Sequence, residues 1–65
     1  MNEYQERVIE EKAELDARRG RLLKFISSSP HFLSLGKDEQ QRLVRQNKIM
    51  ILYSDVLQER IESFK

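Results

Sequence analysis

The stretch SSSPHFL, residues 27–33, divides the chain into two long segments. Serine side chains compete for the hydrogen bonds of a helical backbone, and the residue before a proline is disfavoured in the α conformation. We therefore expect the first helix to end near Ile26. Ser29 is then predicted to cap a short turn with Pro30 at its first position. His31–Leu33 should form one helical turn whose apolar side closes the end of a hairpin.

The segment before this stretch has the periodicity of an amphipathic helix. Its apolar residues recur at spacings of three, four and seven, as a helix requires, and are Tyr4, Val8, Leu15, Leu22 and Phe25. Asn2 is a favourable N-cap, and Glu3 and Glu6 lie where the helix dipole favours negative charge. Gly20 weakens the helix by roughly 1 kcal/mol relative to alanine, so we expect a close helix contact or a slight bend there.

The segment after the stretch predicts a second helix from about Lys37 to Ser63. Gly36 occupies its N-cap position, and Glu39 follows at the spacing of a capping box. One apolar series has a strict seven-residue period and consists of Leu43, Met50, Leu57 and Phe64. It is extended by Tyr53 and Ile61, and it is interrupted by Asn47 and Ser54 on the same face. A seven-residue period indicates two helices packed at a shallow angle.

Together these patterns predict an all-α fold with a single domain over residues 1–65. Its two long helices are joined by a short Ser/Pro turn that contains a one-turn helix. More apolar residues lie beside the predicted seam than one hairpin can cover, namely Ile9, Leu23, Val44, Ile51 and Val56. Because a chain of 65 residues buries only a modest core, the sequence predicts a helical homo-oligomer.

Composition excludes several classes of protein. The chain has no cysteine and one histidine, His31, which excludes disulfides and metal clusters built from cysteine or histidine. A formal net charge of +1 argues against a duplex nucleic acid as partner. No apolar run approaches the ~20 residues that span a bilayer, and the acidic N-terminal segment is unlike a signal peptide. We therefore expect a cytoplasmic protein without a membrane partner.

No arrangement of residues predicts catalysis or a cofactor. The sequence lacks a glycine-rich phosphate loop, a plausible Ser-His-Asp set and metal-ligand spacing. Acidic residues such as Glu10, Glu11 and Glu14 share a helix with Lys and Arg, where intrahelical ion pairs are the ordinary explanation. The sequence therefore predicts a protein that is not an enzyme.

The most unusual feature is a run of cations, Arg18, Arg19 and Arg21 with Lys24 beyond them. The run is either a solvated helix face or an anion site, since arginine binds phosphates bidentately and stacks on bases. Tyr4 lies fifteen residues before Arg19, about 22 Å along one helix, so a single chain cannot place both on one small ligand.

Two antiparallel copies of the first helix would bring Tyr4 of one copy near Arg19 of the other. Tyr4 would then offer its ring to a purine base; the alternative is a core aromatic at the helix end. Arg60 has no distinguishing neighbours in the sequence and is expected to be a surface arginine.

An ordered set of residues resembles a family of small phage-encoded helical proteins, the anti-CBASS type 2 proteins. The resemblance covers nearly the whole chain, includes the connection FISSSPHFLSL, and rests on Tyr4, Arg7, Val8, Glu11, Leu15, Leu22, Phe25, Ile26, Phe32, Leu35, Glu39, Leu43, Gln46, Met50, Tyr53, Leu57, Arg60 and Ile61. Most of these positions are helix-packing residues.

The resemblance implies a homohexamer that acts as a sponge in the cytoplasm of an infected bacterium. Such proteins bind cyclic oligonucleotide signals of bacterial defence systems and do not cleave them. For cyclic dinucleotides the resemblance implies contacts from Tyr4 and Arg19, with Arg18 and Arg21 close by. For cyclic trinucleotides it implies Arg60, which we expect to act with Gln5. The family residue that corresponds to Arg19 is typically lysine, so this chain departs from the pattern there.

Two other functions remain compatible with the sequence. The chain is alternatively a protein-interaction adaptor or phage anti-host factor that docks a coiled-coil-like face on a host protein. It is less well described as a small helical dimer related to transcription, because its net charge is close to zero.

Overall fold

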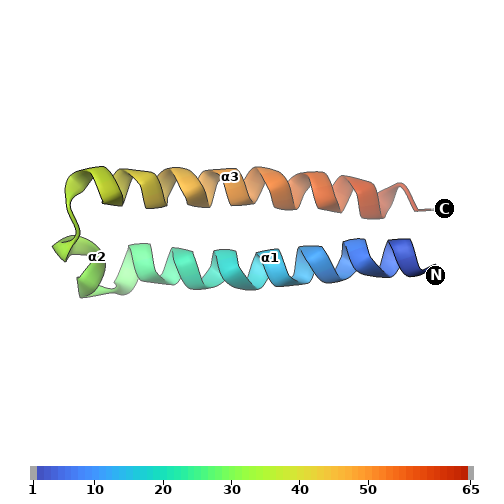
Figure 1. Ribbon diagram of the computed structural model, residues 1–65, viewed down its shortest axis with the longest axis horizontal. Coiled ribbons are helices and arrows are strands. Elements are labelled where there is room, and N and C mark those ends of the chain that lie inside the picture. The colour runs from blue at the N-terminus through green and yellow to red at the C-terminus, as the bar shows by residue number, and fades with distance from the viewer. Residues whose placement is uncertain (1, 65) are drawn as a thin grey trace.

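Two long helices of equal length form a hairpin with a short helix at its turn (Figure 1). The computed structural model describes residues 2–64; α1 spans Glu3–Ser28, α2 spans Pro30–Ser34 and α3 spans Lys37–Glu62. The all-α prediction is confirmed. The molecule is a rod of 47 × 15 × 13 Å, and the two ends of the chain lie at the same end of it.

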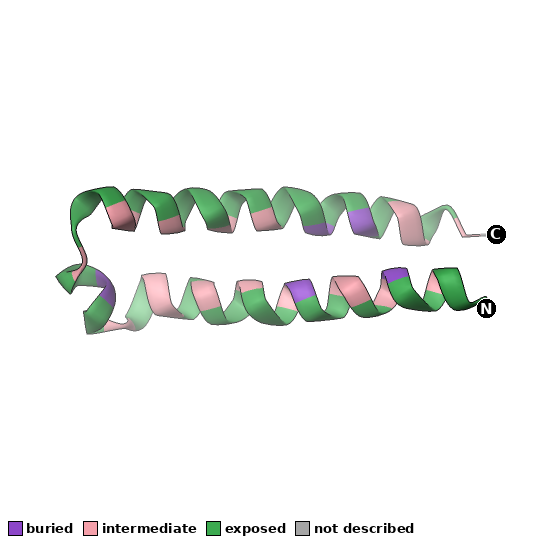
Figure 2. Ribbon diagram, viewed as in Figure 1, coloured by how far each residue is buried: buried purple, intermediate pink, exposed green. Residues whose placement is uncertain are grey.

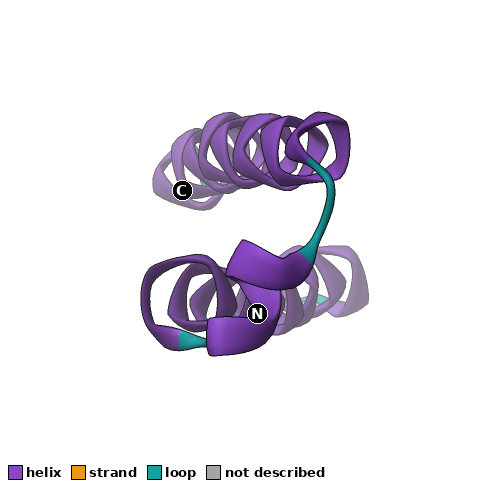
Figure 3. Ribbon diagram, turned by 90° about the vertical axis from the view of Figure 1, so that its left-hand side faces the viewer, coloured by secondary structure: helices purple, strands orange, loops and turns teal. Residues whose placement is uncertain are grey.

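Side-chain and backbone caps fix the ends of the helices. The backbone N–H of Gln5 donates to the Asn2 side chain at 2.8 Å, and the Gln5 side chain accepts from the Asn2 N–H at 3.4 Å, which together form a capping box. The N–H of Ser29 donates to the Phe25 carbonyl, and its hydroxyl accepts from the N–H of His31. Ser29 therefore ends α1 and begins α2. Figure 3 shows the short loop that separates these two helices.

The first helix continues two residues beyond its predicted end at Ile26. The hydroxyl of Ser27 donates to the carbonyl of Leu23 at 2.8 Å, one helical turn earlier. A serine that bonds back in this way is accommodated inside a helix, so only the restriction before Pro30 ends α1. Gly36 begins α3 without a side-chain cap; the Gln40 side chain instead donates to the Leu35 carbonyl at 2.8 Å and ties down the connection.

The apolar core lies between α1 and α3 toward the end of the rod that carries the termini (Figure 2). Its buried members are Val8, Leu15 and Leu57, and Leu57 is fully covered at 0% exposure. Partly buried residues of the predicted series pack against them, namely Met50, Ile61 and Phe64. The seven-residue series of α3 therefore faces α1, as predicted.

One expectation about the seam is wrong, and at Gly20 one of the two expected alternatives, the close contact, is excluded within the hairpin. Tyr53 does not extend the buried stripe, because it is 43% exposed on the flank of α3. Gly20 is not at a close contact between α1 and α3, since a Cβ atom placed there would meet nothing within 4 Å.

At the turn, Phe32 is buried and packs edge-on against Phe25 at 6.0 Å between ring centroids.

The hairpin leaves many large apolar side chains uncovered. Those that were predicted to need a partner are Leu23, Val44, Ile51 and Val56. Others on α3 are Ile49 and Leu52. No helix within residues 2–64 combines the length and apolarity needed to cross a membrane.

Candidate functional site

An aromatic ring and a guanidinium are in contact at the end of the hairpin opposite the turn, which we call its open end. Tyr4 lies in the first turn of α1 and Arg60 in the last turn of α3. A terminal nitrogen of Arg60 donates to the Tyr4 hydroxyl at 2.7 Å, and the guanidinium carbon lies 5.7 Å from the centre of the ring. Phe64 packs edge-on against the same ring at 6.2 Å.

This pair has the chemistry of a nucleotide-binding surface. Tyr4 is 57% exposed, so part of its ring remains available for stacking by a flat ligand. The Arg60 guanidinium is a fixed cation with further donors for a phosphate oxygen. The family resemblance implies different pockets for these two residues, whereas within one chain they touch.

Gln5 follows Tyr4 but is engaged in the helix cap. Its side-chain carbonyl accepts from the Asn2 backbone, which leaves the amide nitrogen of Gln5 for other partners. This second role was not expected from the sequence, although a glutamine at the third helical position is a recognised capping signal.

Arg19 lies at the middle of the rod beside a polar cluster that joins the two long helices. One oxygen of Asp16 accepts from the Ser54 hydroxyl on α3 at 2.6 Å, and the other accepts from Lys12 at 2.6 Å. Nε of Arg19 is 3.9 Å from Asp16 and makes no hydrogen bond within the described part of the chain.

The pKa of Asp16 lies below its usual range. The hydrogen bond from Lys12 is the largest cause, and that from Ser54 adds to it. Partial desolvation opposes the shift, while the charges of Lys12 and Arg19 favour it. Asp16 is therefore a carboxylate at neutral pH, and it is surrounded by two cations.

The remaining cations of the run are exposed on the second half of α1. Arg18 is exposed, and Arg21 lines a shallow hollow of about 350 Å³ together with Lys24, Phe25, Ser28 and Ser29. No acidic residue follows Asp16 on this helix, so its second half carries positive charge only. Tyr4 remains about fifteen residues away at the other end of α1, so one chain does not combine it with Arg19, as predicted.

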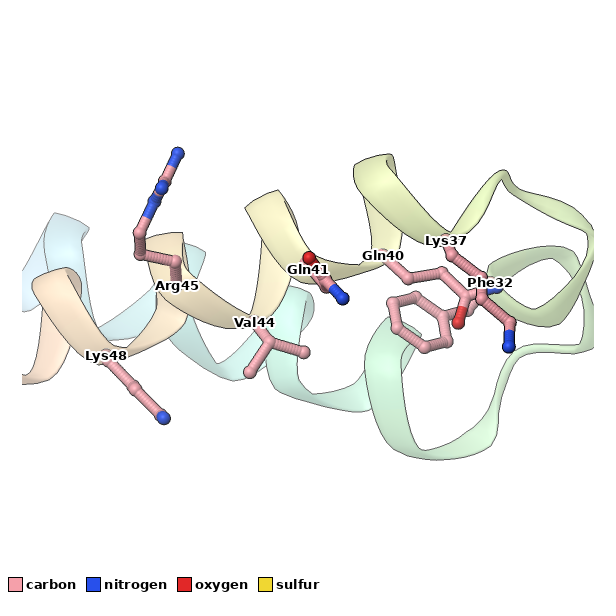
Figure 4. Close-up of a pocket in the computed structure, with 7 residues that line it drawn as sticks. All are labelled: Phe32, Lys37, Gln40, Gln41, Val44, Arg45 and Lys48. Atoms are coloured by element: carbon pink, nitrogen blue, oxygen red, sulfur yellow. The ribbon is translucent and has the colours of Figure 1, made fainter.

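A second basic surface, which the sequence analysis missed, lies near the turn (Figure 4). It is a shallow groove of about 580 Å³ lined by Phe32, Lys37, Gln40, Gln41, Val44, Arg45 and Lys48. The signal for it was the recurrence of Lys37, Arg45 and Lys48 along α3 without an acidic residue lining the same groove. Within residues 2–64 no cluster of His, Asp and Glu is suited to a metal ion.

A family model described as Sequestin matches residues 2–63. The chain belongs to the Sequestin family. Membership indicates that the protein sequesters a ligand, which is a binding role rather than catalysis. Neither a curated protein sequence nor a solved structure matches the chain.

The Sequestin match includes every candidate residue described above except Phe64. Tyr4, Arg19 and Arg60 lie within it, as do Gln5, Arg18 and Arg21. A Sequestin needs a surface that holds a ligand, and the residues expected from the sequence form two candidates. One is the aromatic and cationic pair where the hairpin opens, and the other is the cationic half of α1.

Proposed function

We propose that the protein is a phage sponge that binds cyclic oligonucleotide signals of CBASS defence without cleaving them. Sequestration needs binding groups and no catalytic group, which agrees with the Sequestin match. Its place of action would be the cytoplasm of the infected bacterium. The observation that supports the ligand class is the half-exposed ring of Tyr4 at the end of the hairpin, on which a base can stack while cations of neighbouring copies reach the phosphates.

A homo-oligomer, with six copies as the family resemblance implies, would complete the ligand sites. For a cyclic dinucleotide, Tyr4 of one copy would stack on a base while Arg19 of another meets a phosphate, with Arg18 and Arg21 nearby. For a cyclic trinucleotide, Arg60 and Gln5 of several copies would converge. Uncovered apolar side chains on α3 support self-association, because water contact with them is unfavourable.

Calorimetry with 3′,3′-cyclic GMP-AMP and with cyclic tri-AMP tests this proposal. We expect saturable heat with at least one ligand, and recovery of the intact ligand by chromatography after the protein is denatured. No heat from either ligand at tens of micromolar, with the protein folded, would show that the ligand class is wrong. A shortened or linearised ligand would instead indicate an enzyme.

Substitutions separate the two kinds of ligand contact. Tyr4→Ala and Arg19→Ala should each abolish binding of the dinucleotide while leaving the assembly intact by light scattering. Arg60→Ala should weaken the trinucleotide selectively. Because Arg60 contacts Tyr4, the variant Tyr4→Phe should be measured alongside Arg60→Ala. Tyr4→Phe keeps the ring and removes only the hydroxyl that Arg60 binds.

Arg7→Ala is the matched control for these variants. Arg7 is an exposed arginine near the start of α1 whose partner is Glu3 rather than an aromatic ring. Its loss should leave both affinities within about twofold of the original value, because an exposed ion pair contributes little.

The adaptor function is favoured by one observation, the apolar surface that α3 exposes. An adaptor would keep this surface free for a different protein and would remain a monomer or small assembly without nucleotide affinity. Light scattering combined with the calorimetry above distinguishes it from a sponge.

A further inference from the structure

The positive charges of the chain are gathered in the half of the rod that contains the turn. Residues 17–50 include eight Lys and Arg residues and two acidic residues, whereas the rest of the chain includes four Lys and Arg residues and nine acidic residues. The net charge of +1 therefore conceals a rod with one cationic half and one anionic half. An anionic partner, which the net charge disfavours for the whole chain, is favoured at the half with the turn.

The basic groove near the turn lies in this cationic half (Figure 4). Its three cations, Lys37, Arg45 and Lys48, are all exposed, and the ion pairs found within residues 2–64 involve none of them. The described residues that line the groove include no Asp or Glu. The charge of the groove is therefore not neutralised by the hairpin itself.

The centre of the groove is apolar and aliphatic. Val44 is 37% exposed and lies seven residues after Lys37 and four residues before Lys48, so the three share one side of α3. Figure 4 shows Val44 between the two lysines along the helix. Phe32 closes one end of the groove, but it is only 8% exposed and its ring packs edge-on against Phe25, so little of the ring is free for stacking.

We propose that this groove binds an acidic amphipathic helix of another protein. Lys37 and Lys48 are eleven residues apart, about 16 Å along α3, so carboxylates eleven residues apart on a partner helix would meet both of them. Apolar side chains between those carboxylates would cover Val44, which water leaves poorly solvated.

A strand of nucleic acid fits the groove less well. It carries negative charge along its whole length, including the part that would lie over Val44, and it finds no well-exposed aromatic ring there for its bases. The alternation of cation, apolar residue and cation matches an amphipathic helix, in which acidic and apolar side chains also alternate along one side.

This contact goes beyond the sponge function and does not rest on it. The groove lies beside the turn, whereas Tyr4 and Arg60 are in contact at the opposite end of a rod 47 Å long. A nucleotide held at the open end and an acidic helix held in the groove would therefore occupy separate surfaces.

Fluorescence polarisation with a labelled synthetic peptide tests the proposal. The probe has about 20 residues, enough to form a helix in an alanine-rich sequence, with two glutamates eleven residues apart and leucines between them on the same side. We expect saturable binding at tens of micromolar or below. A peptide of the same composition with the leucines moved to the opposite side, and one with lysines in place of the glutamates, should each bind at least about tenfold more weakly.

Charge reversal in the groove should weaken binding of the acidic peptide. Lys37→Glu and Lys48→Glu should each raise its dissociation constant about fivefold, and the double variant about twentyfold, because attraction becomes repulsion at each end. Arg42→Glu is the matched control. Arg42 is also exposed on α3, but it lies two residues before Val44, nearly on the opposite side of the helix, and pairs with Glu39. Its reversal should change the constant by about twofold or less.

Val44→Lys separates an acidic helix from a nucleic acid. The new lysine adds positive charge and removes the apolar centre, so it should weaken the acidic peptide about tenfold. The same change should tighten a labelled strand of about 20 thymidylates, because phosphates respond to charge alone. If Val44→Lys unfolds the protein by circular dichroism, Val44→Thr removes apolar contact at nearly the same volume and should weaken the peptide about threefold.

Each other outcome overturns the proposal. Failure of the acidic peptide to bind the folded protein, as when another copy covers the groove, shows that the groove is not its site. Equal binding by the peptide with relocated leucines shows that charge alone acts, and tighter binding of the thymidylate strand identifies a nucleic-acid surface. Calorimetry with cyclic nucleotides on the same protein is a separate measurement, so failure of this contact and failure of the sponge are distinguishable.

Discussion

The two halves of the hairpin are built from the same two helices but cover their seam to different extents. The open half, residues 3–15 and 54–64, contains the buried residues Val8, Leu15 and Leu57. In the closed half, residues 17–50, Leu22 and Leu43 are only half-buried, and Phe32 under the turn is the one buried residue. Figure 2 shows this gradient along the rod.

The border between the halves is polar. Asp16 and Ser54 join across the seam there, and two turns further along α3 Asn47 places a buried carbonyl oxygen without a partner among the described residues. A seam that admits polar groups loses apolar burial, which is the main favourable contribution to folding. Stability is therefore concentrated in the open half, while the cations of α1 belong to the half that is less tightly packed.

The largest expected effect comes from truncating the centre of the open half. Leu57→Ala should lower the free energy of unfolding by about 2–5 kcal/mol, since it removes a fully buried side chain and leaves a cavity. Leu43→Ala in the closed half should cost about 1–2 kcal/mol, because its side chain is half-exposed. Urea denaturation at one fixed protein concentration compares the two.

If Leu57→Ala does not fold, Leu57→Val permits the same comparison with a smaller cavity. An equal or greater cost for Leu43→Ala would contradict the difference in packing between the two halves. It would mean that the closed half is covered by another chain in solution.

A gain of about 1 kcal/mol is expected from Gly20→Ala in the closed half. Alanine favours a helix over glycine by this amount, and the new methyl group would meet nothing within 4 Å in the hairpin. Ala17→Gly is the reverse control at an exposed position of the same helix and should lose a similar amount. If Gly20→Ala is destabilising, a neighbouring helix packs on Gly20 in the assembly.

A smaller effect, confined to acid, is expected at the border. The pKa of Asp16 is lowered by folding, so its carboxylate stabilises the folded state fully at neutral pH. This contribution is lost as the pH falls below about 4, through the lowered pKa of the folded state. The difference in stability between wild type and Asp16→Asn should therefore shrink from pH 7 to pH 3 in thermal melts.

Asp55→Asn on the exposed side of α3 is the control for Asp16. A difference for Asp16→Asn that stays constant down to pH 3 would show that the bonds from Lys12 and Ser54 do not act through its charge.

The smallest effect is expected at the tip of the open half. Tyr4→Phe keeps the ring against Phe64 and removes only the acceptor of Arg60, an exposed interaction. Unfolding should change by about 0.5 kcal/mol or less, as measured by the same urea titration. A loss comparable to that of Leu57→Ala would mean that the Tyr4–Arg60 pair, and not the apolar seam, stabilises the open half.

Much of the fold follows from local sequence signals. Ser29 and Pro30 fix the turn, Asn2 fixes the start of α1, and the series through Leu57 identifies the buried face of α3. The misplaced residue, Tyr53, shows the limit of such patterns: it neighbours the seam series in sequence, but the angle of the helix turns it onto the flank.

The candidate site was less predictable, because it depends on the relative position of the two helices. Arg60 meets Tyr4 only through the axial register of α1 and α3, and a seven-residue period leaves that register undetermined by whole turns. The Asp16–Ser54 bond, between residues 38 positions apart, has the same origin. The cations at positions 18, 19 and 21 could be found because they lie within four consecutive residues of the sequence.

The common position of the two chain ends has a practical consequence for any assay. A purification tag or fluorescent protein fused to either end would emerge beside Tyr4 and Arg60 and obstruct the nucleotide that we propose to bind there. A dye attached at Leu33, which is 76% exposed on the far side of a rod 47 Å long, would report on the molecule from a distance. A binding measurement that detects no nucleotide affinity in a tagged protein should therefore be repeated after the tag is removed.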